Sequence, residues 1–127
     1  MAGTSDYLEA AVLDAVLRNT SYTSPTNVFV ALYTSDPGDD NSGTECSGTA
    51  YARQSAAFSR TAGVGSNTSA IEYPTAGGSW GTISHIGILD AVSSGNLLYH
   101  AALSSSKAIT TGDIFRIPAA DLTVTMT

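Results

Sequence analysis

The segment of residues 80–90, WGTISHIGILD, constrains the fold more than any other part of the chain. It carries β-branched residues at Ile83, Ile86 and Ile88, and segments rich in Gly and Ser precede and follow it. A short apolar run bounded by turn residues is typical of a central, largely buried strand. Residues 97–102 form the next apolar run after a Ser-Gly-Asn turn. The sequence therefore predicts a β-hairpin at the centre of the molecule.

Residues 5–19 show the one convincing helical pattern. Asp6 can cap the start of this helix, and Glu9, three residues later, completes a capping-box pattern. The apolar positions that recur at helical spacing are Leu8, Val12, Ala15 and Val16. We therefore expect an amphipathic helix that packs this stripe against the rest of the protein.

Short apolar segments separated by turn residues fill the remainder of the chain. Residues 27–34 are apolar on both faces, and residues 122–126 alternate between apolar and polar side chains, as in a half-buried strand. Further strands are expected at residues 50–58, 69–73, 107–109 and 113–117, with a hairpin turn at 110–112, a loop at 60–69 and a turn at 103–106. About seven short strands with frequent turns indicate a mainly β fold, an antiparallel β-sandwich or barrel with one N-terminal amphipathic helix.

The length and charge of the chain limit the kinds of protein that it can be. The 127 residues fit a single domain, residues 1–127. The net charge is −6 and the five basic residues are scattered, so we expect no binding to nucleic acid. No segment approaches the ~18 apolar residues of a membrane span, so no membrane contact is expected. The N-terminus also lacks a signal-peptide pattern, which predicts a protein made in a cytoplasm.

Residues 77–81, GGSWG, match the G-x-S-x-G nucleophile elbow, with Ser79 as the nucleophile. Asp90 and His100 follow in the chain order of a catalytic triad. The elbow requires a helix after the serine, whereas a β-branched strand is expected here. We therefore expect a glycine-rich loop that orients Trp80, and no catalytic residues, with a serine hydrolase as the remote alternative.

The candidate metal ligands form weak patterns. His85 and His100 lie on the two strands of the central hairpin and are expected to be cross-strand neighbours, but two histidines without a third ligand make a weak site. Residues 35–48 resemble a calcium loop in composition, yet the spacing differs from that of an EF-hand. Cys46 is the single cysteine, which excludes an intrachain disulfide. We therefore expect no metal and no cofactor.

Two segments are expected to contact other subunits. The carboxylates of residues 35–48 would repel one another without countercharge, which favours a partner that offers Arg or Lys. The apolar stripe of the helix is the expected contact between copies of the chain. The candidate interface residues are Leu8, Val12, Asp36, Asp39, Asp40 and Glu45.

Five segments in combination resemble a family of small tailed-bacteriophage proteins. They are LYTSDP at 32–37, GTE at 43–45, YARQ at 51–54, WGTISHIGILD at 80–90 and GNLLYH at 95–100. Members are described as virion structural or tail-fibre proteins, and some resemble capsid decoration (cement) proteins. The similarity spans residues 5–126. The resemblance implies a non-enzymatic structural component of the virion, made in the host cytoplasm.

The sequence favours the head over the tail as the place of this component. A fibre needs a repetitive shaft or a coiled coil, and the sequence has neither. We therefore expect a capsid decoration protein that stabilises the head shell, with a tail, tail-fibre or baseplate module as the alternative. The expected partners are the major capsid protein or another virion protein, and further copies of the chain in a homotrimer, because small shell proteins gather at symmetry axes.

Overall fold

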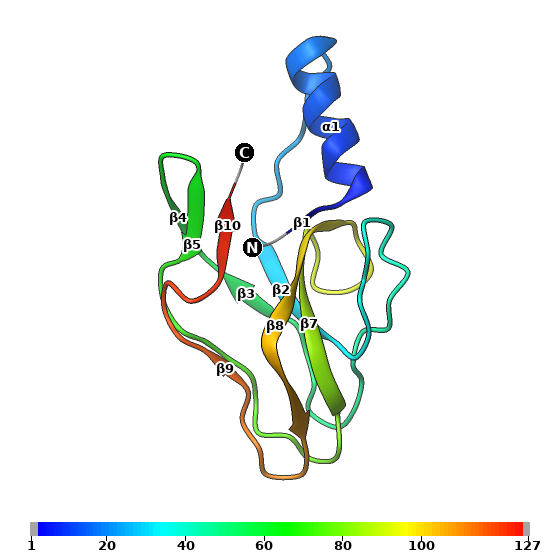
Figure 1. Cartoon of the computed structure of the whole chain (residues 1–127), viewed down its shortest axis with the longest axis vertical. Coiled ribbons are helices and arrows are strands. Elements are labelled where there is room, and N and C mark those ends of the chain that lie inside the picture. The colour runs from blue at the N-terminus through cyan, green and yellow to red at the C-terminus, as the bar shows by residue number, and fades with distance from the viewer. Residues whose placement is uncertain (1–2, 126–127) are drawn as a thin grey trace.

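The computed structural model describes residues 3–125 and confirms a mainly β fold with antiparallel sheets and one N-terminal helix (Figure 1). The elements are β1 Gly3–Thr4, α1 Asp6–Leu17, β2 Val28–Tyr33, β3 Gln54–Ala56, β4 Phe58–Thr61, β5 Val64–Asn67, β6 Ile71–Glu72, β7 Gly81–Leu89, β8 Leu97–Ile109, β9 Arg116–Ile117 and β10 Thr123–Thr125. The last predicted strand is confirmed as β10, while Met126 lies outside the described residues.

The strand β7 lies at the centre of the main sheet, whose order is β1-β8-β7-β2-β3. It is antiparallel to both of its neighbours, so the predicted central hairpin of β7 and β8 is confirmed. Ile83, Ile86 and Ile88 are at most 3% exposed. These side chains share one core with Val30 and Leu32 of the neighbouring strand β2, which point to the same face of the sheet.

An irregularity in the β7–β8 pairing brings these isoleucines to the same face. Ile83 pairs with Lys107, but His85 pairs with Ala102, so the register shifts between them. Such a bulge resets the alternation of a strand, which lets Ile83 and Ile86 point into one core although they are three residues apart. The predicted turn at residues 103–106 is therefore wrong, because this segment is an irregular part of the 13-residue strand β8.

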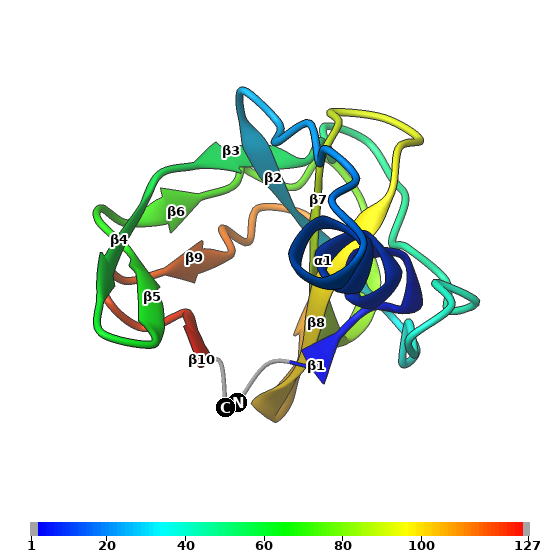
Figure 2. The same ribbon diagram turned by 90° about the horizontal axis from the view of Figure 1, so that it is seen from above.

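Two small sheets form the second layer, with the orders β10-β5-β4 and β6-β9. Figure 2 shows β4, β5 and β10 curving round to face β7 and β8 from the other side of the core. The loop predicted at residues 60–69 is wrong, because most of it forms the β4–β5 hairpin. Ala62 has a φ of +52° in that hairpin turn. The turn predicted at residues 110–112 is confirmed, but β9 pairs with β6 instead of forming the predicted hairpin.

Aromatic side chains fill the core between the layers. Trp80 is 2% exposed, and its indole Nε1 donates a hydrogen bond to the carbonyl oxygen of Thr49 at 3.0 Å. The hydroxyl of Tyr73 donates to the carbonyl oxygen of Val30, which joins the second layer to β2. The rings of Tyr73 and Phe115 pack edge to face at 5.8 Å. Each buried polar group of these rings thus has a partner, as burial requires.

The helix α1 stands at one end of the molecule, beyond the ends of β7 and β8 (Figure 1). Ser5 caps it, because its side chain accepts from the amide of Leu8 and donates to the carbonyl oxygen of Leu97. The predicted cap at Asp6 is wrong by one residue, and Glu9 falls one position beyond the N3 site of a capping box. No helix within residues 3–125 is long and apolar enough to cross a membrane.

Candidate interaction surfaces

The acidic loop, residues 35–48, is held in one shape by contacts among its own residues. The carboxylate of Asp36 accepts a hydrogen bond from the amide of Gly38 at 2.9 Å, and Gly38 has a φ of +64°. Pro37 is fully buried, although Asp36 before it is exposed. A Cβ at Gly43 would lie 2.5 Å from the carbonyl oxygen of Asp36. The two backbone segments therefore approach so closely that only glycine fits at position 43. The loop therefore presents its side chains in fixed positions.

The two histidines of the central hairpin face this loop. Nε2 of His100 lies 2.7 Å from Oδ1 of Asp39, and Nε2 of His85 lies 4.0 Å from Oδ1 of Asp36. The histidines are not directly opposite each other, because His85 pairs with Ala102. Since His100 pairs with Gly87, the two histidines are diagonal cross-strand neighbours. Within the described residues, no group of three or more His, Cys, Asp or Glu side chains is placed to hold a metal ion.

The carboxylate of Glu45 is bound inside the protein. Arg53 donates to it from Nε at 2.9 Å and from Nη2 at 2.8 Å, and the hydroxyl of Tyr51 donates to it at 2.6 Å. Burial would raise the pKa of Glu45, but the hydrogen bonds from Arg53 and Tyr51 outweigh it and hold that pKa below its ordinary value. Although Glu45 was a candidate interface residue, its charge is neutralised within the chain.

The other acidic residues of the loop keep their side chains accessible. The side chains of Asp36 and Asp39 are 65% and 55% exposed despite their histidine neighbours. Asp40 is also exposed, and hydrogen bonding to Ser42 lowers its pKa. Three of the four predicted carboxylates are therefore brought together on one accessible surface.

Cys46, at the end of the acidic loop, is a packing residue. It is 5% exposed and belongs to the main core. Burial raises the pKa of its thiol to about 12, and the nearby charge of Glu45 adds to this effect. The thiol therefore stays protonated at neutral pH and is a poor nucleophile.

Ser79 does not occupy a nucleophile elbow. Its Oγ accepts a hydrogen bond from the amide of Gly81 at 3.3 Å, and β7 begins at Gly81, so a strand follows the serine instead of a helix. Asp90 is engaged with Asn96, and His100 is engaged with the acidic loop. Within residues 3–125 these three candidate triad residues form no hydrogen bond with one another.

The exposed apolar side of α1 is not the side that the sequence indicated. Leu8 is 5% exposed and Val12 is partly buried, so both pack within their own chain. Val16, which we expected on the same inner stripe, is 73% exposed. Leu13 and Leu17 are also 56% and 74% exposed. The sequence did indicate a second apolar side, because this helix is apolar almost all round and such helices are usually covered on every side.

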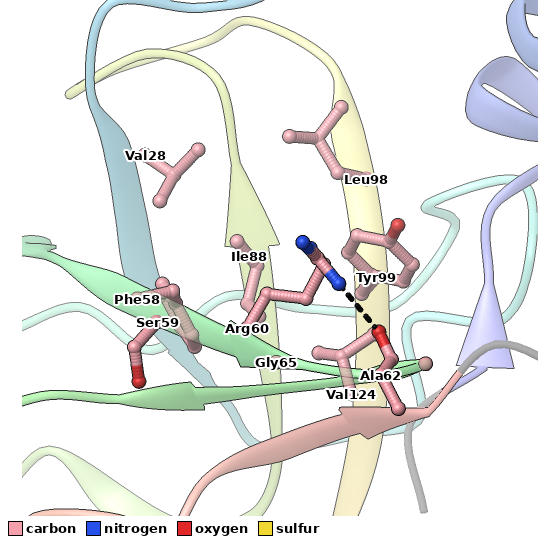
Figure 3. Close-up of a pocket in the computed structure, with 11 residues that line it drawn as sticks. Val28, Phe58, Ser59, Arg60, Ala62, Gly65, Ile88, Leu98, Tyr99 and Val124 are labelled. Atoms are coloured by element: carbon pink, nitrogen blue, oxygen red, sulfur yellow. Dashed lines mark hydrogen bonds between the residues drawn. The ribbon is translucent and has the colours of Figure 1, made fainter.

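An apolar groove of about 520 Å³ lies between the β4–β5 hairpin and the main sheet (Figure 3). The side chain of Arg60 reaches from β4 toward Tyr99 on β8, and its Nη1 donates to the carbonyl oxygen of Ala62 at 3.0 Å. No sequence pattern indicated this groove, because residues 60–69 in its outer wall were expected to be a loop. The main apolar residues that line it are Val28, Phe58, Ile88, Leu98, Tyr99 and Val124.

The family model described as "Podophage GP4 fiber I protein gp80" matches residues 3–125. No match was found among curated proteins. The match covers nearly the whole chain and confirms the resemblance to virion structural proteins of tailed bacteriophages. The chain belongs to the family of the podophage GP4 fiber I protein gp80.

Proposed function

We propose that this protein is a non-enzymatic structural component of the virion and that it works in the tail fibre. The observation that carries this proposal is the family match over residues 3–125, because the family description names a fibre protein. The capsid decoration role that the sequence favoured has less support for the same reason. The absence of an enzymatic role is proposed from Ser79, whose strand–loop–strand setting lacks the helix of a nucleophile elbow.

Within a fibre, this protein would act as a compact module attached to the shaft. A shaft requires repeated units or a long coiled coil. The described chain instead has a 12-residue helix and short strands arranged in two layers. We also propose that several copies act together as a homotrimer, because α1 exposes apolar side chains that a single chain leaves uncovered.

The acidic loop is the surface proposed to bind another virion protein. Asp36, Asp39 and Asp40 are held on a shaped backbone in a chain whose net charge is −6. A single exposed ion pair contributes only ~0–1 kcal/mol, so a partner must supply several basic groups at once. Contacts of this kind weaken as the salt concentration rises.

The virion role is tested on purified phage particles. Mass spectrometry should detect the protein in the particles, and a labelled antibody should mark the tail fibres. Particles that carry Ser79→Ala should form in normal yield, because the hydroxyl has no catalytic role in this proposal. Absence from the particles, labelling of the head, or an esterase activity lost in Ser79→Ala would each contradict the proposed function.

The role of the acidic loop is tested by detachment from particles. Release should increase with sodium chloride and should not respond to a calcium chelator at constant ionic strength. Replacing Asp36, Asp39 and Asp40 together by Asn should cause release at lower salt. Asp121→Asn, an exposed carboxylate outside the loop, serves as the matched control. Release by the chelator alone would instead assign a bound cation to the loop.

A further inference from the structure

The helix α1 carries an outer face that its own chain does not cover. Leu13, Val16 and Leu17 are 56%, 73% and 74% exposed, and Leu13 and Leu17 lie on the side away from the buried Leu8. Glu9 lies four residues before Leu13 and begins the same face. A helix of 12 residues is marginal without burial of its apolar side chains. Asp6, seven residues before Leu13, lies on this face as well. The outer face of α1 is therefore an apolar stripe with two carboxylates at its start, and it requires a partner.

The groove offers a surface of matching composition. Its floor is apolar, with Ile88, Leu98 and Val124 at 3%, 4% and 9% exposed. Arg60 extends over this floor (Figure 3) and forms no ion pair within residues 3–125. The groove thus combines an apolar bed with one cationic group, which is the complement of the outer face of α1.

The outer face of α1 and the groove cannot meet within one chain as it is folded. Ser5 fixes the start of the helix to the carbonyl oxygen of Leu97, and Leu8 is packed beneath the helix. This anchoring directs Leu13 and Leu17 away from the body of their own chain. The occupant of the groove must therefore come from another molecule.

We propose that the outer face of α1 of one copy inserts into the groove of a second copy, with Leu13 and Leu17 on the apolar floor and Glu9 beside Arg60. The groove volume of about 520 Å³ lies in the ordinary range of protein binding pockets. Two copies of a chain with net charge −6 repel each other in general. The pairing of Glu9 with Arg60 supplies opposite charges at the contact and fixes its register.

This contact is heterologous, because it joins two different surfaces of the same chain. Such contacts close into a ring or continue as a filament. A closed ring of three copies would give the homotrimer proposed above. The inference rests on that self-association but not on the location of the protein in the virion, which the particle experiments test separately.

Sedimentation of the full chain over a range of concentrations tests the proposal. The wild-type protein should self-associate, and Leu13→Asp or Arg60→Glu should each weaken the association by about tenfold or more. Both positions are exposed, so circular dichroism should show unchanged folding. Ile114→Asp alters another exposed apolar residue outside both surfaces and should have no effect. A wild-type protein that stays monomeric at all soluble concentrations would overturn the proposal.

Mixing the two variants distinguishes this contact from a symmetric pairing of helices. The Leu13→Asp chain keeps an intact groove, and the Arg60→Glu chain keeps an intact helix. An equimolar mixture should therefore form a one-to-one complex that neither variant forms alone. The double variant Glu9→Arg with Arg60→Glu should recover association through the reversed ion pair. A mixture that forms no complex, or an association that Arg60→Glu does not weaken, would exclude the helix-in-groove contact.

Discussion

Arg53 and Glu45 form a two-point ion pair, with Nη2 to Oε1 at 2.8 Å and Nε to Oε2 at 2.9 Å. The remaining guanidinium nitrogen, Nη1, donates to the carbonyl oxygens of Ala91 and Ser94 at 2.9 and 2.8 Å. The side chain of Arg53 is only 9% exposed. One arginine therefore joins the acidic loop to the turn of the central hairpin, and both segments depend on its charge.

Glu45→Gln should lower the free energy of unfolding by about 1.5–3 kcal/mol at pH 7, because hydrogen bonds to a charged group are lost. The pKa of Glu45 is lowered in the folded state. Its stabilising effect is thus present above the unfolded pKa of about 4.3 and is lost as the pH falls through the folded value. Urea unfolding of both proteins from pH 7 to pH 3 should show the difference shrinking in acid. A difference that is constant with pH would contradict this role of the carboxylate.

Ile86→Ala and Ile88→Ala should each cost about 2–5 kcal/mol of stability, because each opens a cavity in the main core. The two side chains are 2% and 3% exposed. Ile114→Ala is the matched control, since this isoleucine is 49% exposed and its truncation should change stability by no more than about 0.5 kcal/mol. Urea midpoints provide the measurement. Near-neutral results at both core positions would show that β7 does not carry the core.

Ser5→Ala should destabilise the protein by about 1–3 kcal/mol. It removes the helix cap and leaves the carbonyl oxygen of Leu97 without the Ser5 hydroxyl. Asp6→Ala should have a smaller effect, because Asp6 only contributes charge to the first turn. Thermal unfolding of the two variants compares the positions directly. An equal or larger loss in Asp6→Ala would argue that the cap lies there.

Gly43→Ala should destabilise the acidic loop by about 1–3 kcal/mol, because the new methyl group would overlap the backbone of Asp36. Gly78→Ala is the control, since the nearest atom to its Cβ would be Thr49 Oγ1 at 3.9 Å. Hydrogen exchange of the loop amides should rise in Gly43→Ala and stay unchanged in Gly78→Ala. Unchanged exchange in both would mean that the loop can relax around the extra atom.

The sequence predicted the elements whose hydrophobic pattern is strong and local. The isoleucines of β7 and the two-sided apolar pattern of β2 indicated a buried central hairpin, and the structure confirms it. The β4–β5 hairpin escaped prediction because Gly65 and Ser66 are typical of loops. Pairing with β10, more than fifty residues later, makes this segment a strand.

The candidate interaction surfaces could also be predicted only in part from the sequence. Composition identified the acidic loop, but it did not reveal that Arg53 neutralises Glu45 while Asp36 stays accessible. The groove depends on residues as far apart as Val28 and Val124. Such a surface exists only after the layers have packed, so local sequence patterns carry little information about it.

The long strand β8 also has a consequence for behaviour at high concentration. Within residues 3–125, the ladder on its outer edge joins Tyr99 and His100 to the two residues of β1, and Ser5 binds the carbonyl oxygens of Leu97 and Leu98, so the edge beyond His100 has no strand partner. An open, flat edge is a template for indiscriminate strand addition and aggregation. The irregular segment at 103–106 and the charge of Lys107 interrupt this edge. The free part of this edge is therefore a poor template for the addition of a strand from a second copy.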